Sequence, residues 1–508
     1  MNLLSSASIF SFFTLISRIL GYLRDILIAI FLGASIFADA FFVAFRLPNT
    51  FRRLFAEGTF NAAFIPSYTA AKLKNRNTGR IFADNVLSFL LLVLIFIVTL
   101  AEIFTPYLVY LIAPGFIVDD VKFNLAVEFT RITFPFLLFV SLSSFFSGIL
   151  NSNNKFAAAA AAPIILNVVL IISILVSYIQ DLNTAKQLSY GVTVAGILQL
   201  IFLIYFSFKF YKPSIKFKFK VTNKLKIFFK KLLPSIFSSG VTQINILVGT
   251  IIASFQSGAV SYLYYADRVY QINLAIAGIA VGTVSLPVLS KALKMKNYLT
   301  VSKIQNNSLQ LSLLLSIPAS LGLIIASEEI INGLFGYGSF TLKDVKLTSD
   351  ALMFFGYGII AFALVKVLTT FFFARGNTKT PFYVSSFIVL LNIIISVSLF
   401  DRFGFLIIPI ATSFSTWVGV FIFLYLMKRN NFLLIQKKLY LNIFKIVIST
   451  IIMSTALTFI LRKYSIYLDY TYIYKSVWLL FIVGFVGIVY FISCYFLGLL
   501  KIKNYEAN

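Results

Sequence analysis

Charged side chains inside long apolar stretches are the residues of this chain best suited to chemistry. The basic ones are Arg18, Arg24, Arg46, Arg52, Arg53, Arg131, Arg268 and Lys366. The acidic ones are Asp25, Asp39, Glu57, Asp84, Glu128 and Asp267. Arginine keeps its charge and presents a planar fork of donors, so a surplus of arginine suits phosphate better than a proton or a metal cation. These residues predict a site for an anionic ligand.

Other kinds of site are excluded by composition. The chain has no histidine and one cysteine, Cys494, so it has no intrachain disulfide, no His/Cys zinc site and no imidazole-activated nucleophile. It also has no Gly-Lys dipeptide, and therefore lacks the phosphate loop of ATP-driven pumps. We expect neither an enzyme nor a cofactor.

The elements that position these charges must be membrane helices. Of 508 residues, 60% are hydrophobic and 12% are charged, which is too apolar for a water-soluble chain. Apolar stretches long enough to cross a bilayer recur about fourteen times. They span 6–32, 36–66 (with a break near Pro48), 81–113, 124–150, 157–179, 187–211, 225–255, 259–289, 303–326, 345–373, 381–400, 404–427, 440–461 and 471–499. The predicted fold is an all-α polytopic membrane protein.

The loops indicate the orientation. Lys and Arg number 43 against 17 acids, and most of them concentrate in one set of alternate loops that has almost no acids. The other set holds the loop acids together with fewer basic residues, namely Lys122, Lys186, Lys343, Lys346, Arg402, Arg462, Lys463 and Lys475. Because basic loops stay in the cytoplasm, both termini are predicted to be cytoplasmic. The net positive charge is divided among short loops that membrane spans separate. Such a distribution does not predict a nucleic-acid-binding surface.

Two internal similarities predict a repeat. The segment from Phe42 resembles the segment from Tyr264, with Arg46 matching Arg268, and a second pair of segments ends at Asn167 and Asn392. We therefore predict an N-terminal lobe of six helices (1–211), a basic cytoplasmic linker (212–231), a second six-helix lobe (232–428) and two further helices (429–508). Such a plan is typical of transporters whose substrate path lies between the lobes.

Depth and spacing suggest roles for the buried charges. An arginine at mid-span costs about 2.5 to 3.5 kcal/mol on insertion scales, so these side chains must face protein or a wet cavity. The arginines Arg18, Arg24, Arg52 and Arg268 outnumber the nearby acids and are predicted to bind the ligand. Four residues are assigned to ion pairs or gating: Asp25, Asp39, Arg53 and Glu57. We expect Arg53 to pair with Glu57, four residues on. We also expect Asp39 to pair with Arg24, one of the four arginines above, near the outer side.

Three segments carry a resemblance to a known family. They are SRILGYLRD (17–25), ADAFFVAFRLPNTFRRLFAEGTFNAAFIPSY (38–68) and ADRVYQINLAIAGIAVGTVSLPVLS (266–290). The chain resembles the MurJ (MviN) family of bacterial lipid II flippases, within the MOP flippase and exporter superfamily. The likeness covers nearly the whole chain, and the second segment is long and specific.

The resemblance implies a V-shaped cavity between two lobes and a groove for the polyprenyl tail on the last two helices. The implied function is alternating-access transport of lipid II in peptidoglycan biosynthesis, with membrane lipids and cell-wall synthesis proteins as further partners. The family's cavity arginines fall on Arg18, Arg24, Arg52 and Arg268, and its acidic partners on Asp25, Asp39 and Glu57. Some members bind a cation through carboxylates where this chain has Gln243, Asn245, Asn392 and Ser396, so we expect no metal.

Two alternatives remain open at this stage. The first is export of another polyprenyl-linked saccharide or of amphipathic drugs, which accumulation of peptidoglycan precursors on depletion would distinguish. The second is a non-transporting scaffold for cell-wall enzymes that uses the basic linker as a docking surface. A scaffold leaves the intramembrane arginines without a role.

Overall fold

The computed structural model describes residues 3–56, 59–214 and 243–500, and these residues form helices joined by short connections, with no strand among them. The chain divides into two compact units, residues 1–261 and 262–508. Ten described stretches are long and apolar enough to cross a membrane, so the chain is a multi-pass membrane protein.

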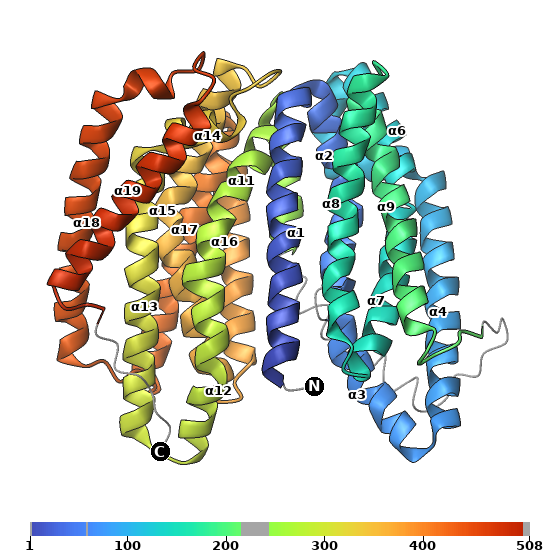
Figure 1. The fold of residues 1–508 in the computed structure, drawn as a ribbon, viewed down its shortest axis with the longest axis horizontal. Helices are drawn as coiled ribbons and strands as arrows, with labels where there is room; N and C mark the ends of the chain where they lie inside the picture. The colour runs from blue at the N-terminus through green and yellow to red at the C-terminus, as the bar shows by residue number, and fades with distance from the viewer. Residues whose placement is uncertain (1–2, 57–58, 215–242, 501–508) are drawn as a thin grey trace. The chain divides into compact units, whose positions relative to one another are not determined.

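The first unit is built from the helices seen in blue to green in Figure 1. They are α1 (Leu3–Leu32), α2 (Ile36–Ala56), α3 (Thr59–Lys74), α4 (Arg76–Ile103), α5 (Thr105–Ile112), η1 (Pro114–Val118), α6 (Asp120–Thr133), α7 (Phe136–Ser152), α8 (Phe156–Ile179) and α9 (Thr184–Ser207). A shorter apolar helix, Gln243–Ala253, follows. Helix α1 packs against α8, and α2 packs against α6 and α7.

Stacked aromatic rings hold the interior of the first unit. Phe60, Phe64 and Tyr68 of α3 succeed one another at ring distances of 5.3 and 5.5 Å, and Phe145 of α7 lies 5.1 Å from Phe64. Gly148 permits this approach, since a Cβ there would lie 2.7 Å from the Phe64 ring. Such close packing between membrane helices relies on small residues.

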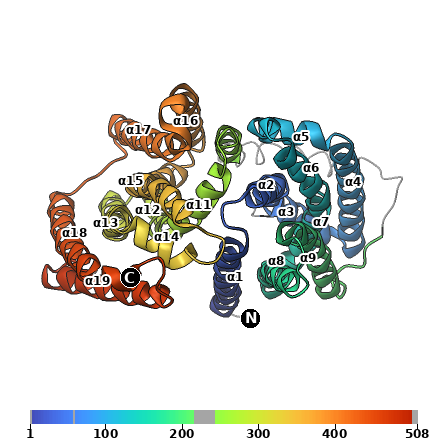
Figure 2. The same ribbon diagram turned by 90° about the horizontal axis from the view of Figure 1, so that it is seen from above.

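The second unit continues in yellow to red. It comprises α11 (Ala259–Leu274, which begins at the boundary), the π-helical η2 (Ala275–Ala280), α12 (Val281–Lys294), α13 (Tyr298–Ile325), α14 (Ser327–Phe335), α15 (Leu342–Phe373), α16 (Lys379–Phe403), η3 (Gly404–Leu406), α17 (Ile407–Arg429), α18 (Lys437–Lys463), η4 (Ser465–Leu468) and α19 (Lys475–Phe496). Figure 2 shows α18 and α19 at the side of α13 and α14, and these helices are in contact.

The helix order repeats with a constant offset. Helices α4, α5 and α6 start at Arg76, Thr105 and Asp120, and α13, α14 and α15 start 222 residues later, at Tyr298, Ser327 and Leu342. The same offset relates Phe42 to Tyr264. The helices therefore agree with the repeat that the sequence predicts.

The predicted spans differ from the helices in two respects. The second predicted span does not break at Pro48, because α2 runs through this residue to Ala56. Proline is tolerated inside membrane helices where neighbouring groups satisfy the carbonyl that it leaves unpaired. The fourth predicted span is instead two helices that meet at Phe134 and Pro135. The span 225–255 and the linker 212–231 lie largely outside the described residues, so the count of fourteen stays a prediction.

A buried lysine fastens α19 to the rest of the second unit. Lys475 is 1% exposed, and its Nζ donates to the carbonyl oxygens of Gly336 and Tyr470. The rings of Tyr337 and Tyr470 lie 4.3 and 4.5 Å from the same nitrogen. Two carbonyls and two aromatic faces thus enclose the cation.

We expect Lys475→Met to lower the free energy of unfolding by about 1 to 3 kcal/mol, because it leaves buried carbonyl oxygens without a donor. The measurement is the thermal unfolding midpoint of the purified protein in detergent. The control is Lys343→Met, at an exposed lysine near the start of α15. Equal midpoints for the two variants would contradict the role given to Lys475.

Candidate functional site

The first candidate site, here called the Arg24 cluster, consists of Arg24, Asp25 and Asn167. Arg24 and Asp25 are adjacent on α1 and are 6% and 2% exposed. The arginine donates from Nε and Nη2 to Asp25 Oδ1, at 3.0 and 2.6 Å, and from Nη1 to Asn167 Oδ1 of α8, at 2.9 Å. A carboxylate and an amide thus fix the guanidinium of a membrane helix.

Asn167 ties the two helices together as well as orienting the arginine. Its Nδ2 donates to the backbone oxygen of Ser17, at 2.8 Å, about two turns before Arg24 along α1. The Asn167 side-chain oxygen therefore accepts from Arg24, and its nitrogen donates to the backbone of α1. Together the two hydrogen bonds fix the position of α1 along the axis of α8. Asn167 positions Arg24 within the membrane.

The second candidate site, here called the Asp39 cluster, consists of Asp39, Lys122, Gly258 and Ser261. Asp39 lies in the first turn of α2 and is fully buried. Its Oδ2 accepts from Lys122 Nζ of α6 at 2.6 Å and from the Gly258 backbone N–H at 2.9 Å. Its Oδ1 accepts from the backbone N–H and the hydroxyl of Ser261, at 3.0 and 2.6 Å.

The Asp39 carboxylate therefore caps the N-terminus of α11, which begins at Ala259. The unpaired N–H groups at a helix start and the helix dipole both favour a negative charge there. Lys122 adds a formal positive charge and is itself 4% exposed, with the Phe116 ring 4.1 Å from its Nζ. A buried carboxylate is thus neutralised by one cation and satisfied by three further donors.

A second contact brings the same segments together. The backbone N–H of Gly115, in η1, donates to Ser254 Oγ at 3.0 Å. A Cβ at Gly115 would lie 2.5 Å from the backbone of Phe255, so only glycine fits this approach. The turn before α6 and the chain before α11 are therefore in close backbone contact beside the Asp39 cluster.

The other predicted site residues are placed as follows. Arg18 is exposed on α1, and Arg52 is half-buried on α2, where its Nε donates to Asn49 Oδ1 at 2.9 Å. Arg53 is half-buried on the same helix. Glu57, its predicted partner, lies outside the described residues. In the second unit, Arg268 of α11 is half-buried, and its Nη2 donates to the Tyr264 hydroxyl at 2.8 Å.

The pairing within the first unit differs from what the sequence suggested. Asp39, for which Arg24 was the expected partner, pairs with Lys122, and Arg24 pairs with its neighbour Asp25. Lys122 looked like a residue of an acidic outer loop, because it follows Asp119 and Asp120. The helix start at Asp119, whose side chain accepts from the Lys122 N–H, places Lys122 in the first turn of α6 instead.

The residues at the family's cation site do not supply a carboxylate. Asn392 and Ser396 are buried on α16, and the serine hydroxyl donates to the Asn392 side-chain oxygen at 3.2 Å. These oxygens are neutral, whereas a cation site of the expected type uses charged ones. The donor set of Asn392 and Ser396 does not fit that kind of site.

Comparison with known proteins gives a consistent result. The chain matches a family model described as lipid II flippase MurJ over residues 28–478. A probable lipid II flippase MurJ of Rickettsia prowazekii is 38% identical over 515 residues, which cover 100% of both chains. One of Rhizobium tropici is 40% identical over 425 residues, covering 82% of this chain and 80% of the relative.

Solved structures agree with these matches. A lipid II flippase MurJ in an inward closed conformation superimposes with a TM-score of 0.81 at 28% identity, covering 96% of this chain and 98% of the other. An inward-facing multidrug transporter of the MATE family, in the MOP superfamily, gives a TM-score of 0.66 at 14% identity over 81% of this chain and 94% of its own. The second likeness concerns the fold alone.

Proposed function

Because this chain belongs to the MurJ family of lipid II flippases, we propose that it carries lipid II from the inner to the outer leaflet of the bacterial cytoplasmic membrane. Alternating access of two repeated lobes is the proposed route, with both termini in the cytoplasm. The observation that carries the proposal is the family match over residues 28–478. The matched residues include Asp39, Lys122 and Arg268, whereas Arg24 and Asp25 precede them.

The proposed ligand group is the pyrophosphate of lipid II. Arg18, Arg24, Arg52 and Arg268 would each contribute charge-assisted hydrogen bonds of about 1.5 to 3 kcal/mol, which offset the removal of the diphosphate from water. The Arg24 cluster supports this assignment, because Asp25 and Asn167 accept hydrogen bonds from all three nitrogens of the guanidinium and hold it in a fixed orientation before substrate arrives. Such preorganisation lowers the entropy lost on binding.

The Asp39 cluster is the proposed outer gate. Helix α11 continues from Ser261 into the second unit, so any movement that carries the start of α11 away from α2 must break the bonds to Asp39. A capped helix terminus and an ion pair can form and break as one unit, which is what a two-state gate requires. This assigns the gate to Asp39 with Lys122 rather than with Arg24.

The direct test of the function is a reconstituted vesicle assay. Transbilayer movement of lipid II is compared with that of a polyprenyl monophosphate that lacks the sugar and the peptide. We expect the protein to accelerate movement of lipid II and to leave the monophosphate close to the rate of empty vesicles. Equal acceleration of both lipids, or of neither, would contradict the proposed substrate.

Arg268 provides a test from the second unit. We expect Arg268→Ala to reduce flipping more than about tenfold. The substitution removes a charged contact of about 1.5 to 3 kcal/mol to the diphosphate, and the diphosphate is then also held less firmly in its orientation. Tyr264→Phe is the matched control, since it removes only the hydroxyl that accepts from Arg268 and keeps the ring 4.7 Å from the guanidinium. An active Arg268→Ala protein would remove this residue from the site.

A further inference from the structure

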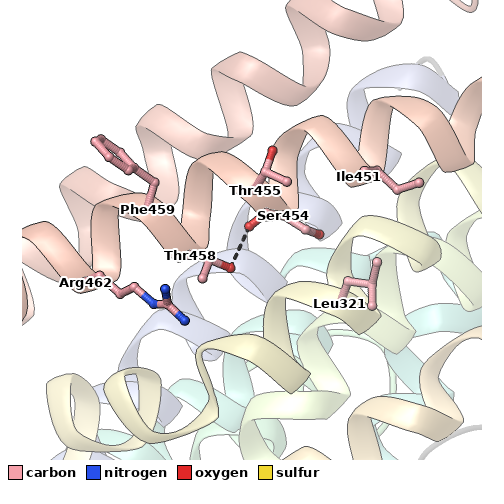
Figure 3. Close-up of a pocket in the computed structure, with 7 residues that line it drawn as sticks. All are labelled: Leu321, Ile451, Ser454, Thr455, Thr458, Phe459 and Arg462. Carbon is pink, nitrogen blue, oxygen red and sulfur yellow. Dashed lines mark hydrogen bonds between the residues drawn. The ribbon is translucent and has the colours of Figure 1, made fainter.

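A groove between α13 and α18 of the second unit is not used by the proposed transport path. It has a volume of about 430 Å³ and is lined by Leu321 of α13 and by Ile451, Ser454, Thr455, Thr458, Phe459 and Arg462 of α18. Figure 3 shows Leu321 and Ile451 near one end and Arg462 at the other. The groove is separate from a second apolar depression, between α18 and α19.

The length of the groove matches one leaflet of a bilayer. The lining residues of α18 recur every three or four positions, and so they share one helix face. Ile451 and Arg462 are eleven residues apart, which is about 16 Å along the helix axis at a rise of about 1.5 Å per residue. Half of a hydrocarbon core of about 30 Å is about 15 Å. The groove thus runs from the depth of a lipid head group to about the bilayer midplane.

The polarity of the groove changes along this length. Arg462 lies in the last turn of α18, is exposed, and has no ion-pair partner among the residues that the structure describes. The Thr458 hydroxyl donates to the Ser454 carbonyl at 2.9 Å (Figure 3). The Ser454 hydroxyl oxygen is buried and has no hydrogen-bond partner in the described part of the chain.

These features do not follow from packing alone. A cation in the last turn complements the helix dipole, which would account for the charge of Arg462 without a ligand. It does not account for an open groove beneath that charge, among whose lining residues is a serine with a buried, unpartnered hydroxyl. An amphipathic ligand, with an anionic end near Arg462 and an apolar end near Leu321, matches the charge and the shape of the groove.

We propose that this groove binds one acyl chain of an anionic glycerophospholipid, with the lipid phosphate on Arg462. One arginine matches the single charge of a phosphodiester, and a groove as deep as one leaflet fits one acyl chain rather than a long polyprenyl tail. The site lies on α13 and α18, and it is independent of the arginines assigned to lipid II. A lipid bound there would lie between α18, of the C-terminal helix pair, and α13, of the second lobe.

The test is native mass spectrometry of the full-length protein in neutral detergent, titrated with phosphatidylglycerol or with phosphatidylcholine of the same chains. We expect the first phosphatidylglycerol to bind at least about fivefold more tightly, since one basic residue near the surface is worth about that factor. Arg462→Gln should remove this preference. Lys463→Gln, which removes an equal charge from the next residue outside the groove, should retain it.

A third variant separates the groove from its charge. Thr455→Phe fills the groove at an exposed position and keeps Arg462, and it should weaken binding of both lipids, whereas Thr455→Val should not. Thermal unfolding confirms that each variant is folded. The proposal is overturned if phosphatidylcholine binds as tightly as phosphatidylglycerol, if Lys463→Gln acts like Arg462→Gln, or if a polyprenyl phosphate displaces phosphatidylglycerol from the groove.

Discussion

Replacing Arg24 with alanine is expected to abolish complementation of a flippase-depleted cell and to reduce lipid II movement in vesicles to background. Arg24 donates to both Asp25 and Asn167, so alanine removes the cation and leaves the buried Asp25 carboxylate without its counter-charge. Breaking a buried pair in this way costs about 3 to 5 kcal/mol. A loss of activity in this single variant could therefore come from loss of the ligand contact or from a less stable protein, and the variant alone does not separate the two.

A double variant separates these two effects. Arg24→Ala with Asp25→Ala removes both charges, so no uncompensated charge stays buried and the protein level should recover. Flipping should stay absent, because the ligand contact is still missing. Asn167→Ala tests positioning: it keeps both charges but frees one edge of the guanidinium, and we expect activity between that of the wild type and of the double variant. A double variant that flips lipid II would show that Arg24 serves structure only.

The sequence predicted the helices, and the burial of three charged residues, better than it predicted the partners of those residues. Apolar length and loop charge locate most spans within a few residues, as for 157–179 and the helix α8 (Phe156–Ile179). Arg24, Asp25 and Asp39 stand out because a charge is costly in an apolar span. Their partners are distant in sequence: Asn167 is 143 residues from Arg24, and Lys122 is 83 residues from Asp39.

Lys122 shows why local sequence could not reveal its role. A lysine beside two acids at the end of an apolar stretch is ordinarily a solvated loop residue. Its burial depends on Asp39, whose carboxylate supplies the counter-charge, and on the cap at Asp119, which starts α6 one turn earlier than hydropathy suggests. Asn167 gave a weak signal, as an amide inside an apolar helix that recurs near the corresponding place in the repeat, at Asn392.

Loss of Lys122 is expected to lower flipping more than about tenfold, because Lys122→Met leaves the Asp39 carboxylate buried without a cation, at a cost of about 3 to 5 kcal/mol. The three remaining donors, two of them N–H groups at the start of α11, offset part of that cost. Amide hydrogen exchange reports the gate directly, since the Gly258 and Ser261 N–H groups are bonded to Asp39. Exchange of the segment 255–263 should accelerate in Lys122→Met and more strongly in Asp39→Ala.

A neutral pair then decides whether the Asp39 cluster is a gate or only a structural tie. Lys122→Met with Asp39→Asn removes both charges and keeps a side-chain oxygen that accepts from α11, so the protein level should recover. Flipping should remain impaired, because an amide holds the helix start more weakly than a carboxylate and the closed state loses its advantage. Asp120→Asn, at an exposed acid in the same turn as Lys122, is the matched control and should change neither exchange nor flipping. If the neutral pair restores flipping along with protein level, the charges serve folding alone, because alternating access would then proceed without the ion pair.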